Sequence, residues 1–228
     1  MRSLLLIAFF IFSVMLAKAQ DIFFPTKEGT VLEYKVFDKK QQETGMIRYT
    51  ITDIKQSGDD MDITYKIESM DAKEKPLFKE EITINKKGDI LYVDMSKFLN
   101  KAALDKAGEK AGKINITGND MEIPSNLKPG DVLPDSNIEM TLKMGFMNIN
   151  MSANVTDRKV EAQEKVTTKA GTFDTYKITN TVTANAMGMK TSTKSAEWIA
   201  KRIGMIKTES YDSDGNISSY TELISIRD

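Results

Sequence analysis

The sequence predicts a mainly β fold: a strongly curved antiparallel sheet or half-barrel of the carrier type, with one short α-helix. Apolar and polar residues alternate with a period of two along most of the chain. Clusters of Gly, Asn and Asp interrupt this alternation and mark turns. Because about half the residues of each expected strand are polar, one face of the sheet should contact water.

The chain begins with a segment typical of a secretory signal peptide. Arg2 precedes an apolar run over Leu4–Leu16, and Ala17-Lys18-Ala19 supplies small residues for cleavage. A membrane anchor is the alternative, but this run is shorter than the ~20 residues of a spanning helix. We expect residues 1–19 to be removed and residues 20–228 to form a single β-rich domain. The domain should be exported to the periplasm or cell surface, with no further transmembrane segment.

The sequence contains neither Cys nor His. Without Cys there is no disulfide framework and no cysteine to carry a lipid, so we do not expect a lipoprotein. Without His, the usual general base and the commonest metal ligand are missing. We therefore expect no enzymatic activity and no cofactor. A net charge of −1, with both signs scattered, gives no indication of nucleic-acid binding.

Strands separated by polar turns fill the first part of the chain, after a start that we expect to be flexible up to Gly29. On the first strand, Leu32, Tyr34 and Val36 share one face. The expected strands are residues 30–37, 47–52, 61–68, 78–84 and 90–93.

The period changes between Met95 and Ala111. Apolar residues recur there at helical spacing, Ser96 can act as the N-cap, and Gly108 lies near the end. These features predict one short amphipathic helix near residues 96–108. A strand at 113–123 and an irregular loop at 124–134 should follow.

The apolar parity inverts at Gly145-Phe146, between two strands at residues 138–144 and 147–151. A two-residue type II′ turn with Gly145 first accounts for the inversion. This turn predicts that three residue pairs face each other: Met144 with Met147, Leu142 with Ile149, and Met140 with Met151.

The next strands have a similar organisation. Residues 155–166 predict a strand with a bend at its Gln and Glu residues. From Phe173 onward, Tyr176 and Ile178 begin an apolar face, and Met187-Gly188-Met189-Lys190 suggests a second tight hairpin with the same turn. The return strand carries Trp198, the single Trp of the chain.

Several segments together resemble a known family. They are Phe24–Gly29 with Leu32-Glu33-Tyr34, then Gly171–Ile178, Glu197–Ala200 and Ile203–Glu209. On these segments the chain resembles the exported DUF3108-like proteins of Bacteroidota, also called the TapB family. The resemblance covers nearly all of the chain after the signal peptide. It implies a mostly antiparallel β fold and supplies no catalytic residues.

A soft apolar face is the best candidate for ligand binding. Met fills irregular apolar space readily, so a Met-rich sheet face could hold an acyl chain or a partner peptide. Cu(I) binding by the thioethers is the alternative, although such a site would favour an additional His or Cys. The candidate ligand-binding residues are Met140, Met144, Met147, Met151, Tyr176, Met187 and Trp198.

The segment Asp212–Asn216 has the alternating oxygens of a calcium loop. Position twelve of such a loop carries a bidentate acid, but here that position is Leu223. Asp, Gly and Asn are also the usual turn residues, so a hairpin turn is the favoured interpretation.

Two hypotheses for function follow, from different classes. The first is a non-catalytic envelope protein that binds an apolar small molecule, a lipid or a partner segment on a concave sheet face. The second is a structural or interaction protein with a filled core, which assembles with an envelope partner through an edge strand. An enzyme would need carboxylates, Lys, Tyr or Ser to converge in a cleft.

Overall fold

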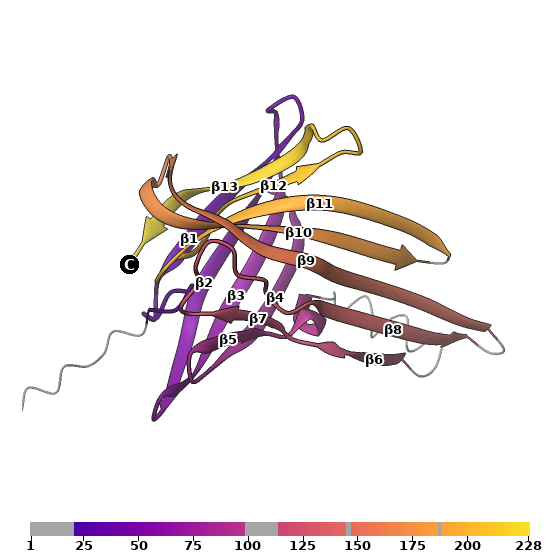
Figure 1. The fold of residues 1–228 in the computed structure, drawn as a ribbon, viewed down its shortest axis with the longest axis horizontal. Coiled ribbons are helices and arrows are strands. Elements are labelled where there is room, and N and C mark those ends of the chain that lie inside the picture. Colours follow the sequence, from indigo (N-terminus) through magenta and orange to yellow (C-terminus); the bar gives the residue numbers. More distant parts are fainter. Residues whose placement is uncertain (1–20, 99–113, 145–146, 187) are drawn as a thin grey trace, which may run out of the picture.

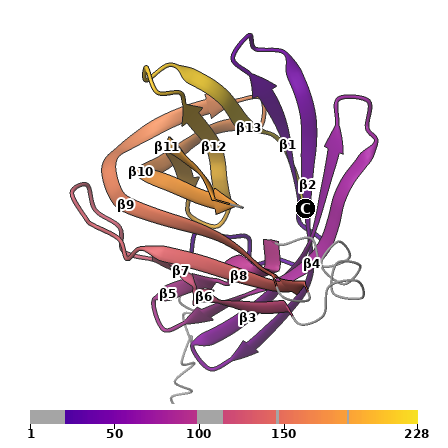
Figure 2. The same cartoon turned by 90° about the vertical axis from the view of Figure 1, so that its right-hand side faces the viewer.

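The computed structural model describes residues 21–98, 114–144, 147–186 and 188–228. These residues form a 13-stranded sheet in which every pairing of neighbours is antiparallel. The sheet curls into a nearly closed, barrel-like shape, from which the long strands β8 to β11 project to one side (Figures 1 and 2). The predicted curved antiparallel sheet is therefore confirmed, and its closure goes beyond a half-barrel.

The strands vary widely in length. The bounds are β1 Val31–Asp38, β2 Glu43–Ser57, β3 Asp60–Asp71, β4 Pro76–Lys87, β5 Ile90–Val93, β6 Ile114–Asn119, β7 Met121–Pro124, β8 Ser136–Met144, β9 Met147–Thr168, β10 Gly171–Ala186, β11 Met189–Ala200, β12 Gly204–Tyr211 and β13 Ile217–Arg227. None of the helical segments within the described ranges has the length and apolar character needed to cross a bilayer.

The two ends of the sheet are joined by the chain itself. The order of strands is β6-β8-β9-β10-β11-β12-β13-β1-β2-β3-β4-β5-β7. Strands β6 and β7 lie at opposite ends of this order, yet only Asp120 separates them in the sequence. The predicted strand at 113–123 is thus divided, with its first half paired to β8 and its second half to β5.

The register predicted for the methionine-rich hairpin is confirmed. Strands β8 and β9 pair Met144 with Met147, Leu142 with Ile149, and Met140 with Met151. The turn residues 145–146 that set this register lie outside the described residues.

The hairpin near Gly188 is tight, as predicted, but its turn lies one residue earlier. Ala186 pairs with Met189, so Gly188 is the second turn residue. Its φ of +83° is a value that glycine adopts readily. Gly188 therefore does not take the first position that a type II′ turn reserves for glycine.

Two other predictions need correction. Met95–Phe98 forms a 3-10 helix in place of the first turn of the expected α-helix. Asp94 begins it, because the Ser96 amide donates to Asp94 Oδ1 at 2.9 Å and the Lys97 amide donates to the Asp94 carbonyl at 3.2 Å. The rest of the predicted helix lies outside the described residues. Strand β9 also continues through the bend expected at its Gln and Glu residues.

The interior contains three apolar clusters instead of one continuous core. The first cluster joins Ile22 to residues of β2, β3, β4 and β5. The second joins Phe23 to β9, β10, β11 and the loop that carries Leu127 and Leu133. The third joins β1, β12 and β13 through Tyr34, Ile206 and Leu223.

Three hairpin turns share one construction built on an aspartate, at Asp38, Asp71 and Asp212. In the turn after β3, the amides of Lys73 and Lys75 both donate to Asp71 Oδ1 at 2.9 Å. The amides of Asp214 and Asn216 likewise donate to Asp212 Oδ1. The segment Asp212–Asn216 is therefore a hairpin turn, as the favoured interpretation predicted.

The fourth position of these turns predicts a stabilising substitution. It is left-handed in each turn, with φ of +61° at Glu74 and +82° at Gly215. Glu74→Gly should raise the free energy of unfolding by about 0.5–1 kcal/mol, because the strain removed exceeds the entropy that glycine adds to the unfolded chain. Gly215→Ala should lower stability in the corresponding turn. Urea unfolding measures both, and a destabilised Glu74→Gly variant would contradict this account of the turn.

Candidate functional site

An apolar cavity of about 260 Å³ lies where the three clusters meet. Its wall is mostly aromatic, aliphatic and thioether side chains, with one carboxylic acid. The lining residues are Phe23, Phe24, Tyr34, Tyr49, Tyr65, Ile84, Leu91, Val93, Met95, Met121, Ile123, Glu197, Ile199, Ile203, Gly204 and Met205.

The N-terminal segment forms part of this wall. Ile22 and Phe23 are buried, at 1% and 2% exposure, and the Arg202 amide donates to the Ile22 carbonyl at 2.7 Å. A Cβ atom on Gly204 would lie 3.1 Å from the Phe23 carbonyl oxygen, and Gly204 has a φ of +90°. Glycine therefore suits this close approach. The start expected to be flexible is instead part of the core from Ile22 onward.

Four aromatic rings form a row across the cavity wall. The ring centroids of Tyr34 and Tyr49 lie 5.2 Å apart, those of Tyr49 and Tyr65 lie 5.2 Å apart, and those of Phe24 and Tyr65 lie 5.0 Å apart. Successive rings are tilted by 54–59°. The row exists because β1, β2 and β3 are neighbours and each points one tyrosine inward.

The tyrosine hydroxyl groups are neutral polar groups of the cavity wall. Burial raises the pKa of Tyr34 and of Tyr65 well above its usual value, and raises the pKa of Tyr49 to about 12. All three hydroxyls are therefore protonated at neutral pH. In the described part of the chain, these hydroxyls are not among the fully buried side-chain atoms that lack a hydrogen-bond partner. As residues that line the cavity, the tyrosines could present their hydroxyls to a polar group of a ligand.

Glu197 is the one carboxylic acid in the cavity wall. It lies on β11, between Ala196 and the buried Trp198, and the antiparallel register pairs it with Ile178 of β10. Burial raises the pKa of the Glu197 carboxyl group, and the charge of Arg158 opposes this effect. The surface of Glu197 remains partly accessible, as expected for a side chain that lines a cavity.

Arg158 of β9 is the buried basic residue whose charge acts on the pKa of Glu197. It is 1% exposed, and its Nη1 donates to the Pro134 carbonyl at 2.7 Å. Its Nε and Nη2 atoms have no hydrogen-bond partner within the described part of the chain. Burial lowers the pKa of Arg158, while Glu197, Asp135 and Glu122 oppose that shift. An incompletely paired guanidinium is an unusual and costly interior group.

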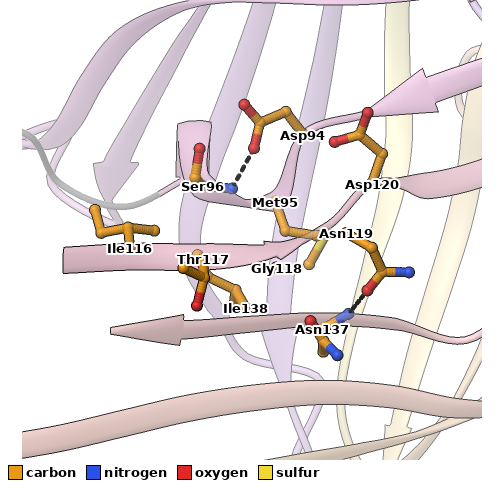
Figure 3. A pocket seen from close by; sticks show the side chains of 10 residues that line it. All are labelled: Asp94, Met95, Ser96, Ile116, Thr117, Gly118, Asn119, Asp120, Asn137 and Ile138. Atoms are coloured by element: carbon orange, nitrogen blue, oxygen red, sulfur yellow. Dashed lines mark hydrogen bonds between the residues drawn. The ribbon is translucent and has the colours of Figure 1, made fainter. Parts of the chain in front are cut away.

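A second concavity, of about 310 Å³, lies beside β6 and has a different character. Figure 3 shows polar side chains around it, including Asp94, Asp120, Asn119 and Asn137. Asn119 Oδ1 accepts a hydrogen bond from the Asn137 amide at 2.8 Å, and Asp94 Oδ1 accepts one from the Ser96 amide, so part of this wall is hydrogen-bonded within the protein. Among the described residues, no three His, Cys, Asp or Glu side chains gather as metal ligands, here or elsewhere.

Four of the methionines predicted to bind a ligand, at positions 140, 144, 147 and 151, belong to the projecting strands β8 and β9. Met140 is 8% exposed and faces Met151 across the β8–β9 pair. The side chains of Met144 and Met147, and the whole of Met187, lie outside the described residues. Met140 and Met151 do not line the aromatic cavity, so their role in binding stays a prediction.

The two aromatic residues in that set occupy different faces of the sheet. Tyr176 packs edge-on against Phe23, with centroids 5.5 Å apart, next to the second cluster. The Trp198 ring lies between the ammonium groups of Lys177 and Lys207, and its indole nitrogen donates to Glu164 Oε1 at 2.6 Å. Consecutive strand residues point to opposite faces, so Trp198 points away from the cavity that Glu197 lines.

The cavity includes residues that the sequence analysis did not select as ligand-binding. Tyr34 was expected on an apolar strand face, and Tyr49 and Tyr65 lie in the strands expected at 47–52 and 61–68. A tyrosine on each of three strands was a signal for a shared aromatic wall. Glu197 gave a weaker signal: an acid alternating with Ser195 and Ile199 on one strand face. Three other methionines, at positions 95, 121 and 205, supply the thioethers of this cavity.

The buried Glu197 predicts a measurable pH dependence of stability. Its folded-state pKa lies above the unfolded value near 4.5, so the native state holds the proton more tightly. The contribution of Glu197 to stability is therefore greatest below pH 4.5 and is lost as pH rises toward the folded pKa. Glu197→Gln should flatten this fall in urea unfolding curves recorded from pH 4 to pH 8.

Glu161→Gln provides a control of opposite sign. A hydrogen bond from Lys159 lowers the pKa of Glu161, so its contribution increases as pH rises. Since Glu161 is exposed, the change should be small. If Glu197→Gln shows the same pH profile as the wild-type protein, the buried carboxyl group is not the source of the fall.

Comparisons with known proteins identify a family for this sequence and solved structures with a similar fold. No curated protein sequence matches the chain. A Bacteroides fragilis protein, provisionally described as exported and YmcC-like in fold, is 19% identical with a TM-score of 0.73, covering 91% of this chain and all of its own. A Parabacteroides distasonis protein, provisionally described as a lipoprotein, is 20% identical with a TM-score of 0.73, covering 91% of this chain and 99% of its own. These likenesses show a shared fold. The family model for DUF3108-like proteins matches residues 27–223, and the chain therefore belongs to the DUF3108-like family.

Proposed function

We propose that the protein is a non-catalytic, exported binding protein that holds a small apolar molecule in the aromatic cavity. The observation that carries this proposal is the combination of an apolar, largely aromatic wall with a few polar groups: three tyrosine hydroxyls and the carboxyl group of Glu197. Small-molecule sites in proteins have this composition: mainly hydrophobic and aromatic surface with a small number of polar groups that orient the ligand.

The size of the cavity supports a compact ligand. Its volume of about 260 Å³ is close to the lower end of the range for small-molecule sites, about 300–1,000 Å³. The space is a pocket that is partly open to solvent and walled by aromatic rings, so a compact apolar molecule could enter it.

A binding role agrees better with the site than a catalytic one. Glu197 is the one carboxyl group in the wall, and the tyrosine hydroxyls of the same wall are protonated at neutral pH. Acid–base chemistry generally needs a positioned group with a pKa near the working pH. Glycosidase-like chemistry would need a second carboxylate facing Glu197.

Export is supported by two features. Residues 1–19 have the pattern of a signal peptide, and the two structural neighbours carry provisional descriptions of an exported protein and a lipoprotein. This sequence has no Cys, so attachment of a lipid to cysteine is not part of the proposal.

Assembly through an edge strand remains the second hypothesis. Strand β6 is an end of the sheet, and five of its six residues are exposed. The other end, β7, has only four residues. Because short edge strands are one way in which proteins limit edge-to-edge pairing, the geometry favours the cavity as the functional feature.

Filling the cavity should abolish binding. Val93 lines the cavity from β5 and is partly buried, so Val93→Phe directs an aromatic ring into the space that a ligand would use. We expect the affinity for the fluorescent apolar probe N-phenyl-1-naphthylamine to fall at least about tenfold. Fluorescence titration of the protein without its signal peptide measures this change.

Val132→Phe is the matched control. Val132 is 77% exposed and lies outside the cavity, so the same substitution there should leave probe affinity unchanged. Urea unfolding identifies any variant that fails to fold. If the wild-type protein does not take up the probe, or if both variants bind it equally, the cavity is not a binding site.

A further inference from the structure

We propose that the ligand carries a cationic ammonium group, as a protonated amine or a quaternary ammonium, which pairs with Glu197 inside the cavity. This inference rests on the proposed function and specifies the chemical class of its ligand. It follows from two properties of the cavity, the single carboxyl group on its wall and the arrangement of its rings, and from the fact that Arg158 is not paired with that carboxyl group.

The wall can carry a negative charge at one position. Glu197 is the single ionisable side chain in the lining apart from the tyrosines. None of the ion pairs among the described residues includes Glu197, so none of their basic side chains lies within 4.0 Å of its carboxylate oxygens. A cation in the cavity would supply the charge-assisted partner that Glu197 lacks, and would favour its ionised form in a place where water is scarce.

Arg158 does not supply the missing partner. Its Nη1 is engaged with the Pro134 carbonyl, and Arg158 is not among the cavity-lining residues. No ion pair within 4.0 Å joins Arg158 to Glu197 among the described residues. The Glu197 carboxyl group is therefore available to a cationic group of a ligand in the cavity.

The rings suit an ammonium group. Tyr34, Tyr49 and Tyr65 lie in a row with Phe24, at centroid spacings of 5.0–5.2 Å and with tilted planes. The face of an aromatic ring is electron-rich and attracts cations, and clustered rings are a known means of recognising quaternary ammonium groups. The aliphatic wall formed by Ile84 and Leu91 would contact the apolar body of the ligand.

A set of probes with one chain and three head groups tests the inference. Octylamine, octanol and octanoate present a cation, a neutral hydroxyl and an anion at neutral pH on the same apolar body. Each is titrated against the protein loaded with N-phenyl-1-naphthylamine, and the concentration that displaces half of the probe is recorded. We expect octylamine to displace it at about tenfold lower concentration than octanol, with octanoate the weakest.

Three variants locate the source of the preference. Glu197→Gln keeps the size of the side chain and should bring octylamine to the level of octanol. Glu81→Gln, on the exposed surface of β4, should leave the order unchanged. Tyr49→Phe keeps the ring and removes the hydroxyl, so the preference for octylamine should persist if ring faces and Glu197 recognise the cation.

The outcomes separate this inference from the function on which it rests. If N-phenyl-1-naphthylamine does not bind, the proposed binding function is wrong. If it binds but octanol or octanoate displaces it as well as octylamine does, the cavity is a binding site and the cationic head group is wrong. Loss of the octylamine preference in Tyr49→Phe, with no loss in Glu197→Gln, would also overturn the assignment to Glu197.

Discussion

Closure of a 13-stranded sheet creates an interior that strand side chains alone do not fill. Barrel width increases with strand number, and about eight strands are enough for side chains to fill the centre. This protein closes its sheet through the continuous chain of β6 and β7, so additional segments must occupy the space. Ile22 and Phe23 enter from the N-terminus, and Leu127 and Leu133 enter from the loop before β8. The cavity is what remains where the clusters built on these segments meet.

The cavity wall contains both apolar and polar side chains because strand geometry decides which residues face inward. Every second residue of a strand points to the interior, whether it is apolar or polar. The inward positions of β1, β2 and β3 carry tyrosines, and that of β11 carries Glu197. Burial makes ionisation of Glu197 unfavourable, and the nearby guanidinium of Arg158 is incompletely paired. Both groups reduce the stability of the interior, and such groups are characteristic of functional sites.

The sequence predicted those features that depend on neighbouring residues. The β8–β9 register followed from the inversion of apolar parity at Gly145-Phe146, and the Asp212 turn followed from its turn residues. The cavity could not be predicted in the same way, because it combines residues from β1 and β11 that are far apart in the sequence. The N-terminal segment looked flexible because it is too short for a periodic pattern, although its aromatic residues complete the core. The predicted helix failed at its start because the Asp94 side chain and carbonyl cap a tighter 3-10 turn.

Fold and ligand specificity are separable in this architecture. Closure depends on strand pairing, on the bend at Asp120 and on the buried N-terminal segment, none of which requires Glu197 or the tyrosine hydroxyls. The structural neighbours share the fold at 19–20% identity, a level at which the cavity lining can differ completely. A protein with the same sheet but an apolar residue in place of Glu197 would keep the barrel and lose the charged group of the site. The inward residues of β1, β2, β3 and β11 therefore set the chemistry of the cavity wall, and the nearly closed sheet determines only that a cavity exists.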